Sequence, residues 1–147
     1  EALEMGGYLH DIGKIAVPDS ILNAPRKLTP EEWRMMQTHP TQGYEICRNL
    51  NSMGEVLPVV LHHHERYDGT GYPAGLAGET IPLLARLFQF VDIFDALQSR
   101  RPYKPPFPVE KILDIFREER DKGWRDPAMC EAFLANRERI ISEKLLG

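Results

Sequence analysis

The sequence predicts an all-α fold built as a single domain. Apolar residues recur at helical spacing in most segments, and the pattern is clearest between Pro82 and Ser99. Proline and capping residues stand where the expected helices begin, and no internal repeat or low-complexity tract interrupts them. With 147 residues, of which 42% are apolar, the chain is long enough to bury one core. We therefore expect a single helical bundle.

The N-terminal segment should contain a helix followed by a loop. Residues 1–10 are expected to be helical in spite of two adjacent glycines. Residues 12–27 contain Pro18 and Pro25, so the sequence predicts a loop there.

A strong helix start follows this loop. Thr29 is a suitable N-cap, Pro30 suits the first helical position, and Glu32 stands three residues after the cap, which is the capping-box spacing. Pro40 should end this helix and begin the next one, over roughly residues 40–50.

The segment after that helix changes sharply in composition. We expect a helix over about residues 55–65 and a long ordered loop over residues 66–81, because the second segment holds four glycines and few apolar residues. Long loops inside compact domains usually have a function.

The C-terminal half should contain three more helices. The first covers residues 82–99, and the second should start near Val109 and stop near Gly123. Asp126, which precedes a proline, should cap a final helix that reaches Leu145.

Charge and cysteine content argue against several classes of protein. The net charge of -4 is unlike that of a general nucleic-acid-binding protein, which should present a basic face. Cys47 and Cys130 lack any CxxC spacing and are expected to be reduced thiols in a cytoplasmic protein. No apolar run could span a membrane, and no signal peptide opens the chain. Because the sequence starts at Glu1, inside an expected helix, we expect a fragment of a longer protein.

All five histidines stand where metal chemistry is a reasonable interpretation. His10 is followed at once by Asp11, His39 precedes a proline between two helices, and a run of three histidines covers residues 62–64. Imidazoles joined by carboxylates suit a divalent transition-metal cluster. Neighbours on a helix are rotated by about 100°, so at most two histidines of the run should face one cluster. Taken alone, His39 would be interpreted as a helix cap.

Asp92 lies in the most apolar helix of the chain. A carboxylate buried there is costly unless a cation, hydrogen-bond donors or a metal ion compensate its charge. Alone it would suggest a salt bridge or a solvent-facing position, but beside the histidines we interpret it as a metal ligand. Asp95 follows on the same face and could orient ligands.

Several cations could meet a bound anion. Lys14 comes four residues after His10, and Arg101 and Lys104 belong to a segment stiffened by proline, where they could hold phosphate oxygens. Arg66 is expected to be an ordinary solvated surface group.

Four sequence blocks together resemble the HD-GYP family, the bacterial cyclic di-GMP phosphodiesterases within the His-Asp metallohydrolase superfamily. The blocks are HDIGK at residues 10–14, THP at 38–40, HHERYDGTGYP at 63–73, and DIFDAL at 92–97 followed by RPYK at 101–104. They occur in the family's order and run through most of the chain.

The resemblance implies a helical bundle around two or three divalent transition metals, iron or manganese. The metal ligands that it implies are His10, Asp11, His39, His63, His64 and Asp92, with His62 outside the set. Residues implied to contact substrate are Lys14, Arg101 and Lys104, at the phosphates, and Tyr72, in the loop that shapes the pocket. This loop is also linked in the family to partner proteins with GGDEF domains, and homodimerisation of the parent protein stays open.

One departure from the family pattern concerns the start of the chain. The family has a further histidine, and in some members a glutamate, some tens of residues before the His-Asp pair, but only nine residues precede His10 here. We therefore expect residues 1–147 to be an HD-GYP domain that lacks its first helices, with an incomplete set of ligands.

The resulting hypothesis is metal-dependent hydrolysis of cyclic di-GMP to the linear dinucleotide pGpG, to GMP, or to both. Two cations would lower the pKa of a shared water that attacks phosphorus. Asp11 is expected to bridge them, and Lys14 to neutralise charge on the phosphoryl oxygens. Two alternatives stay open: a related hydrolase that cleaves another nucleotide, and a non-catalytic domain that binds cyclic di-GMP or docks a partner.

Overall fold

The computed structural model describes residues 1–99 and 105–142, and within these ranges the regular structure is helical. No strand or sheet occurs there, only one isolated antiparallel bridge between Asp68 and Ala77. The prediction of an all-α fold is confirmed. The elements are α1 Ala2–Leu9, 3₁₀ helix η1 Ile12–Ala16, α2 Asp19–Leu22, α3 Pro30–Met36, α4 His39–Cys47, α5 Leu57–His62, 3₁₀ helix η2 Gly78–Thr80, α6 Leu83–Gln98, α7 Val109–Asp121, α8 Pro127–Ala135 and α9 Arg137–Ser142.

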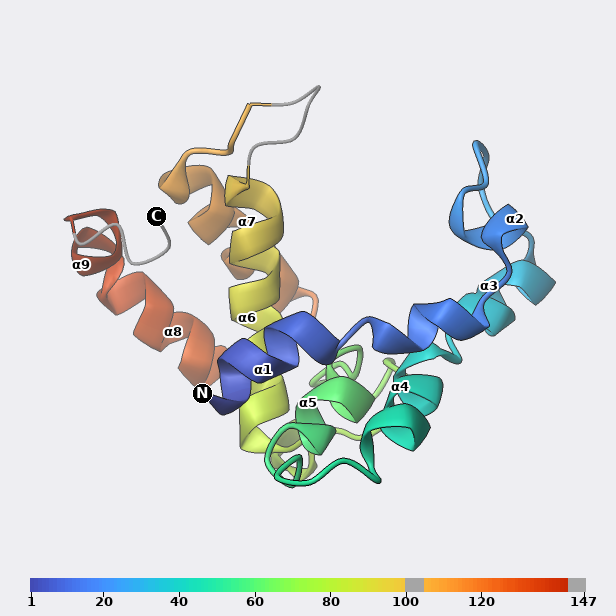
Figure 1. The fold of residues 1–147 in the computed structure, drawn as a ribbon. Helices are drawn as coiled ribbons and strands as arrows, with labels where there is room; N and C mark the ends of the chain where they lie inside the picture. Colours follow the sequence, from blue (N-terminus) through green and yellow to red (C-terminus); the bar gives the residue numbers. More distant parts are fainter. Residues whose placement is uncertain (100–104, 143–147) are drawn as a thin grey trace.

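Helix α6 runs through the middle of the molecule and separates two groups of helices (Figure 1). On one side α7 packs against α6, and α8 against α7; on the other side α1 and α5 contact α6, and α4 packs on α5 and η1. Helices α2 and α3 extend from this second group, on the side away from α9 (Figure 1). No helix in the described part of the chain is long and apolar enough to cross a membrane.

The main apolar core lies between α6 and the C-terminal helices. Its fully or almost fully buried members are Phe90, Phe94, Ile112, Leu113, Phe116 and Cys130. The ring of Phe90 stacks on Phe133 at 5.0 Å and meets Phe116 edge-on, also at 5.0 Å between centroids. This core anchors α6, which carries Asp92 on its opposite side.

Within the second group, the elements pack so closely on one another that some positions leave no room for a side chain. A Cβ atom added to Gly13 of η1 would lie 1.8 Å from the backbone oxygen of His39 on α4. Because only glycine allows this contact, the segment with His10 and Asp11 packs directly against the helix that begins at His39. Val59 and Val60 form the buried face of α5, and both side chains are 0% exposed.

Most helix ends follow the sequence expectation. Thr29 and Glu32 form the capping box, with the Thr29 hydroxyl accepting from the Glu32 amide at 3.2 Å. The Asp126 carboxylate caps α8 by accepting from the amides of Ala128 and Met129. Gly123 follows α7 with φ +81°.

Two expectations about local structure were wrong. Residues 12–27 are not a plain loop, because they contain η1 and the one-turn helix α2, for which Pro18 serves as the N-cap. The expected final helix is interrupted at Asn136, whose side chain donates to the Ala132 carbonyl and satisfies the end of α8. Such short amide side chains compete with the backbone ladder. The predicted end at Leu145 lies outside the described residues.

Candidate metal centre

The Asp11 carboxylate lies at the centre of a group of imidazoles. Its Oδ1 atom is 3.3 Å from His39 Nε2 and 3.9 Å from His63 Nε2. Its Oδ2 atom is 3.4 Å from His10 Nε2 and 2.8 Å from Lys14 Nζ. The two oxygens of one side chain therefore face two different sets of nitrogen atoms.

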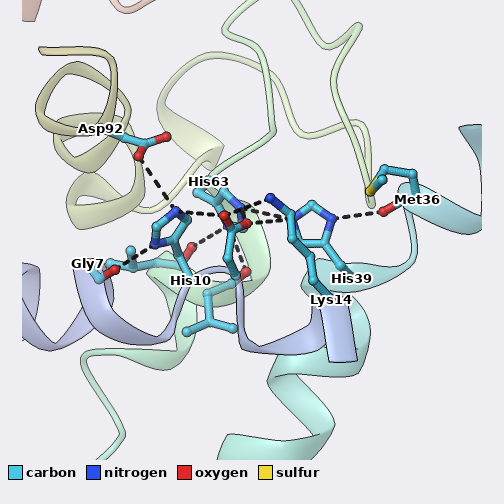
Figure 2. Close-up of polar contacts among 10 residues, drawn as sticks. Gly7, His10, Lys14, Met36, His39, His63 and Asp92 are labelled. Carbon is cyan, nitrogen blue, oxygen red and sulfur yellow. Dashed lines mark hydrogen bonds and ion pairs between the residues drawn. The ribbon is translucent and has the colours of Figure 1, made fainter. Parts of the chain in front are cut away.

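Backbone carbonyls orient three of these rings. The Nδ1 atoms of His10, His39 and His63 each lie 2.8–2.9 Å from a carbonyl oxygen three residues earlier in the chain. Figure 2 shows two of these contacts, at Gly7 and Met36. A carbonyl can only accept, so Nδ1 carries a proton, and Nε2 points to the centre of the site, where it donates when the ring is protonated and offers its lone pair when the ring is neutral.

The arrangement fits a metal ion. Donor atoms of Asp11, His39, His63 and His64 all lie within 4.8 Å of one another. The Nε2 atoms of His39 and His63 approach to 3.3 Å. With both Nδ1 protons engaged by carbonyls, two neutral rings would point lone pairs at each other, and a cation between them makes this contact favourable. Nitrogen and carboxylate donors of this kind suit zinc, iron and manganese.

Burial and charge set the protonation of this group. Burial lowers the pKa of His63 well below its usual value and that of His64 to about 3, so both rings are neutral near pH 7. Burial would raise the pKa of Asp11, but hydrogen bonds with His10, His39 and Lys14 hold it well below its usual range. The site thus offers an ionised carboxylate and neutral imidazoles, the forms that bind metals.

His10 and Asp92 form a second set beside these four residues. The distance from His10 Nε2 to Asp92 Oδ1 is 3.6 Å, and Figure 2 shows His10 between Asp92 and the centre of the site. Burial lowers the pKa of His10, but Asp11 and Asp92 outweigh this effect and raise it.

The Asp92 carboxylate is only partly buried. The side chain is 43% exposed, because it points from α6 toward the site and away from the apolar core. Partial burial still raises its pKa. Asp95 is exposed, and the hydrogen bond that it accepts from Ser99 is long, at 3.4 Å.

The remaining site residues divide into three groups. The phenol ring of Tyr72 stacks on the His64 imidazole, with centroids 4.8 Å apart and planes inclined by 17°, and burial raises the pKa of Tyr72 to about 12. His62 turns away from the cluster, and its Nδ1 lies 3.4 Å from Glu65 Oε1. Arg101 and Lys104 lie outside the described residues.

Sequence reasoning missed Glu65, which fixes the loop after the histidine run. Its carboxylate is fully buried and accepts from the amides of Ala74 at 2.8 Å and Leu76 at 3.0 Å. A Cβ atom on Gly71 would lie 2.3 Å from the Arg66 amide, so the loop also folds tightly back on its own start. The available signal was a carboxylate placed between ligating histidines and a glycine-rich segment.

A cavity of about 310 Å³ opens beside the imidazoles. Its lining residues are Trp33, Gln37, His63, His64, Arg66, Thr70, Gly71, Tyr72 and Arg125. It therefore joins His63 and His64 of the candidate metal centre to the long loop and to the corner between α7 and α8.

Residues 1–129 match the family model described as HD domain. The chain belongs to the HD domain family. Curated cyclic di-GMP phosphodiesterases at 43–45% identity support the resemblance to the HD-GYP family.

This HD domain is similar to several curated phosphodiesterases. It is 45% identical over 147 residues to "Cyclic di-GMP phosphodiesterase response regulator RpfG" of Xanthomonas campestris pv. campestris, covering 99% of this chain and 38% of the relative. It is 43% identical to a "Cyclic di-GMP phosphodiesterase" of Vibrio cholerae, with coverage of 97% and 30%. The "3'3'-cGAMP-specific phosphodiesterase 2" of the same organism is 38% identical, with coverage of 91% and 26%. The chain thus spans between 26% and 38% of the length of these relatives.

A solved structure supports the fold. Bd1817, an HDG"Y"P protein from Bdellovibrio bacteriovorus, matches with a TM-score of 0.62 at 21% identity, over 88% of this chain and 41% of that protein. At this identity, the likeness concerns the fold alone.

Proposed function

We propose that this HD domain is the catalytic part of a metal-dependent phosphodiesterase that hydrolyses cyclic di-GMP. The observation that carries the proposal is the Asp11 carboxylate, which faces His39 and His63 with one oxygen and His10 with the other. A carboxylate shared between two sets of nitrogen donors suits a two-metal phosphodiesterase site. The printed names of the similar proteins support the substrate class.

The proposed ligands form two overlapping sets. The first set is Asp11, His39, His63 and His64, and the second is Asp11, His10 and Asp92. Iron or manganese, in two or three positions, agrees with this mixture of imidazole and carboxylate donors. When bound, these ions would supply a water of lowered pKa and positive charge beside the phosphodiester.

Lys14 is proposed to act on the substrate directly. Its ammonium group is held 2.8 Å from Asp11 Oδ2 and is 40% exposed, so it can neutralise negative charge that grows on a phosphoryl oxygen. Tyr72, whose phenol stays protonated below a pKa of about 12, can donate a hydrogen bond to the nucleotide. Arg101 and Lys104 are proposed as further phosphate contacts on the family resemblance.

The proposal extends to the parent protein. We propose an HD-GYP domain that works as the cytoplasmic output domain of a longer bacterial signalling protein and releases pGpG, GMP or both. GGDEF-domain proteins as partners, and a homodimer of the parent, are proposed on the family resemblance.

The proposal can be tested in the full-length protein that contains this chain. Bound iron and manganese would be quantified, and the hydrolysis of cyclic di-GMP measured, for the wild type and for Asp11→Asn. We expect the variant to lose most of its metal and at least about a hundredfold in kcat. His62→Gln is the matched control, since His62 belongs to the same histidine run but turns away from the cluster.

Hydrolysis at the wild-type rate by a metal-free Asp11→Asn protein would contradict the proposal. Tight binding of cyclic di-GMP without turnover, in fully metal-loaded protein, would instead favour a non-catalytic binding domain.

A second candidate function is hydrolysis of another cyclic dinucleotide. The observation that favours it is the 38% identity to a phosphodiesterase named as specific for 3'3'-cGAMP, which is close to the values for the cyclic di-GMP enzymes. Rates measured on both substrates would distinguish the two candidates.

A further inference from the structure

The cavity beside the imidazoles has an asymmetric chemical lining. His63 and His64 of the proposed metal centre form part of its wall, and its charged lining residues in the described part of the chain are Arg66 and Arg125. No carboxylate is among the lining residues. A group that enters this cavity next to the metal centre therefore meets guanidinium donors.

Arg66 is held in place while its hydrogen-bonding groups stay available. Its Cζ atom lies 3.9 Å from the centroid of the Trp124 ring, and the side chain is half-buried, not the solvated surface group expected from the sequence. Among residues 1–99 and 105–142, no hydrogen bond or ion pair engages its guanidinium. An indole face restricts the position of a guanidinium that lies over it and does not use its N–H groups as hydrogen-bond donors.

Arg125 differs from Arg66 because two of its nitrogen atoms are already engaged by other side chains. Its Nε atom donates to Glu119 at 2.6 Å and one terminal nitrogen donates to Gln89 at 3.2 Å. Within the described part of the chain, Arg66 is thus the lining cation whose guanidinium has no hydrogen-bond or ion-pair partner.

The cavity also has a flat apolar surface in its lining. Trp33 on α3 is 47% exposed and lines the cavity, and its ring meets Tyr72 edge-on with centroids 6.5 Å apart. An indole left open beside a cavity is a surface on which a nucleobase can stack.

We propose that Arg66 reads the guanine base of the substrate, by donating two hydrogen bonds to its O6 and N7 atoms, while Trp33 supports the face of the base. This inference rests on the proposed function. Guanine presents two acceptors on that edge, whereas adenine presents an acceptor and an N–H donor, which an arginine cannot satisfy. Arg66 would then be a specificity-determining residue.

A phosphate group offers the same pair of acceptors, so the experiment must separate the two sources. A phosphate would not use the open indole of Trp33, which is why the observations favour the base.

The test compares kcat/KM for cyclic di-GMP, 3'3'-cGAMP and cyclic di-AMP in the full-length, metal-loaded protein. We expect the wild type to prefer guanine, and Arg66→Met to reduce the ratio of cyclic di-GMP to cyclic di-AMP by about tenfold or more. Arg66→Lys keeps the charge but loses the paired donors, so we expect it to lose most of the preference as well.

Lys122→Met provides a matched control. Lys122 also places its ammonium group over Trp124, at 4.8 Å from the centroid, but does not line the cavity, so its loss should leave the preference unchanged. If Arg66→Met does not fold, as judged by thermal unfolding, Arg66→Lys alone decides.

Three results would overturn the inference: no guanine preference in the wild type, an unchanged ratio in both Arg66 variants, or an equal loss on all three nucleotides, which would indicate a phosphate contact. If the metal-loaded wild type hydrolyses none of them, the proposed function fails. The role of Arg66 is then tested by binding: the ratio of the affinities for cyclic di-GMP and cyclic di-AMP is compared between the wild type and the Arg66 variants.

Discussion

The protonation of single imidazoles decides what this site can bind. His63 and His64 are kept neutral by burial, while the pKa of His10 is raised by the carboxylates around it. Neutral rings bind metals, but the same depressed pKa values make the metal-free protein sensitive to acid. The residues that prepare the site for a metal ion therefore cost stability when no ion is bound.

This cost predicts a pH dependence of the metal-free protein. The pKa of His64 is about 3 when folded, against an ordinary value of about 6.5, so between these limits the unfolded chain binds the extra proton. Stability should fall as pH falls from about 6.5 toward 3, by at most about 1.4 kcal/mol per pH unit for this one imidazole. His63 acts in the same direction, whereas the raised pKa of His10 stabilises the folded state at low pH and opposes it.

Chemical denaturation of chelated protein between pH 7 and pH 4 would measure this slope. The variant His64→Gln should show a shallower dependence than the wild type. Parallel curves for the two proteins would contradict the assignment of the slope to His64.

At the scale of the elements, the position of η1 against α4 brings the ligands together. Gly13 is the contact point, since any Cβ there would overlap the carbonyl of His39. The Glu65 carboxylate plays a similar part for the loop, because its two oxygens hold the amides of Ala74 and Leu76. One contact sets the spacing of two ligand segments, and the other sets the shape of the loop that carries Tyr72.

The substitution Gly13→Ala should separate η1 from α4. We expect it to lower the free energy of unfolding by more than about 2 kcal/mol and to reduce metal content, because the added methyl group meets backbone that cannot move alone. Gly7→Ala is the control: a Cβ there has nothing within 4 Å, so this helical substitution should be neutral or stabilise by up to about 1 kcal/mol. Equal stability of the two variants would contradict the close packing of η1.

The substitution Glu65→Gln tests the loop anchor. An amide nitrogen in place of one oxygen would face a backbone N–H, which should cost about 1–3 kcal/mol of folding free energy and raise KM. Glu79→Gln, at an exposed position of the same loop, should change stability by less than about 0.5 kcal/mol. The two variants can be compared by urea denaturation and steady-state kinetics.

Local signals in the sequence predicted some of these elements well. Thr29, Pro30 and Glu32 lie within one turn of each other, so the start of α3 could be predicted without knowledge of the fold. Helix α2 has only four residues and too short a pattern for any periodicity to register.

The sequence pointed to several histidines and carboxylates that the structure brings together, but not to their surroundings. His39, His63 and the His10-Asp11 pair carry a compositional signal, and the structure brings them together. The exposure of Asp92 depends on how α6 is rotated against the core, and the stacking of Arg66 depends on Trp124, which is distant in sequence. The residues next to Asp92 and Arg66 in the sequence therefore do not reveal either feature.

At the scale of the whole molecule, the site unites segments that the core does not. The proposed ligands come from the end of α1, from α4, from the end of α5 and from α6, whereas the main apolar core joins α6 to α7 and α8. The N-terminal group of helices has its own buried apolar residues, such as Val59 and Val60, and the proposed ligands add a further link between its helices and α6.

Removal of the metal should for this reason destabilise the molecule as a whole. Ligand bound at a hundredfold excess over its Kd contributes about 2.7 kcal/mol, which corresponds to roughly 10 °C in Tm for a chain of this size. We expect chelation to lower the Tm of the wild type by roughly 10 °C and to leave the Tm of the His39→Ala variant almost unchanged. Differential scanning calorimetry with and without chelator measures both, and an equal drop in the two proteins would show that the ion acts elsewhere.

The cavity is completed by the corner between α7 and α8. The amide of Tyr67 donates to the Trp124 carbonyl at 3.0 Å, and Trp124 is also the surface on which Arg66 lies. During synthesis, the histidines and Asp11 leave the ribosome well before this corner does. In a growing chain the proposed metal donors are thus synthesised before the corner that supports Arg66, so order of synthesis would separate the ability to hold an ion from the proposed ability to choose a substrate.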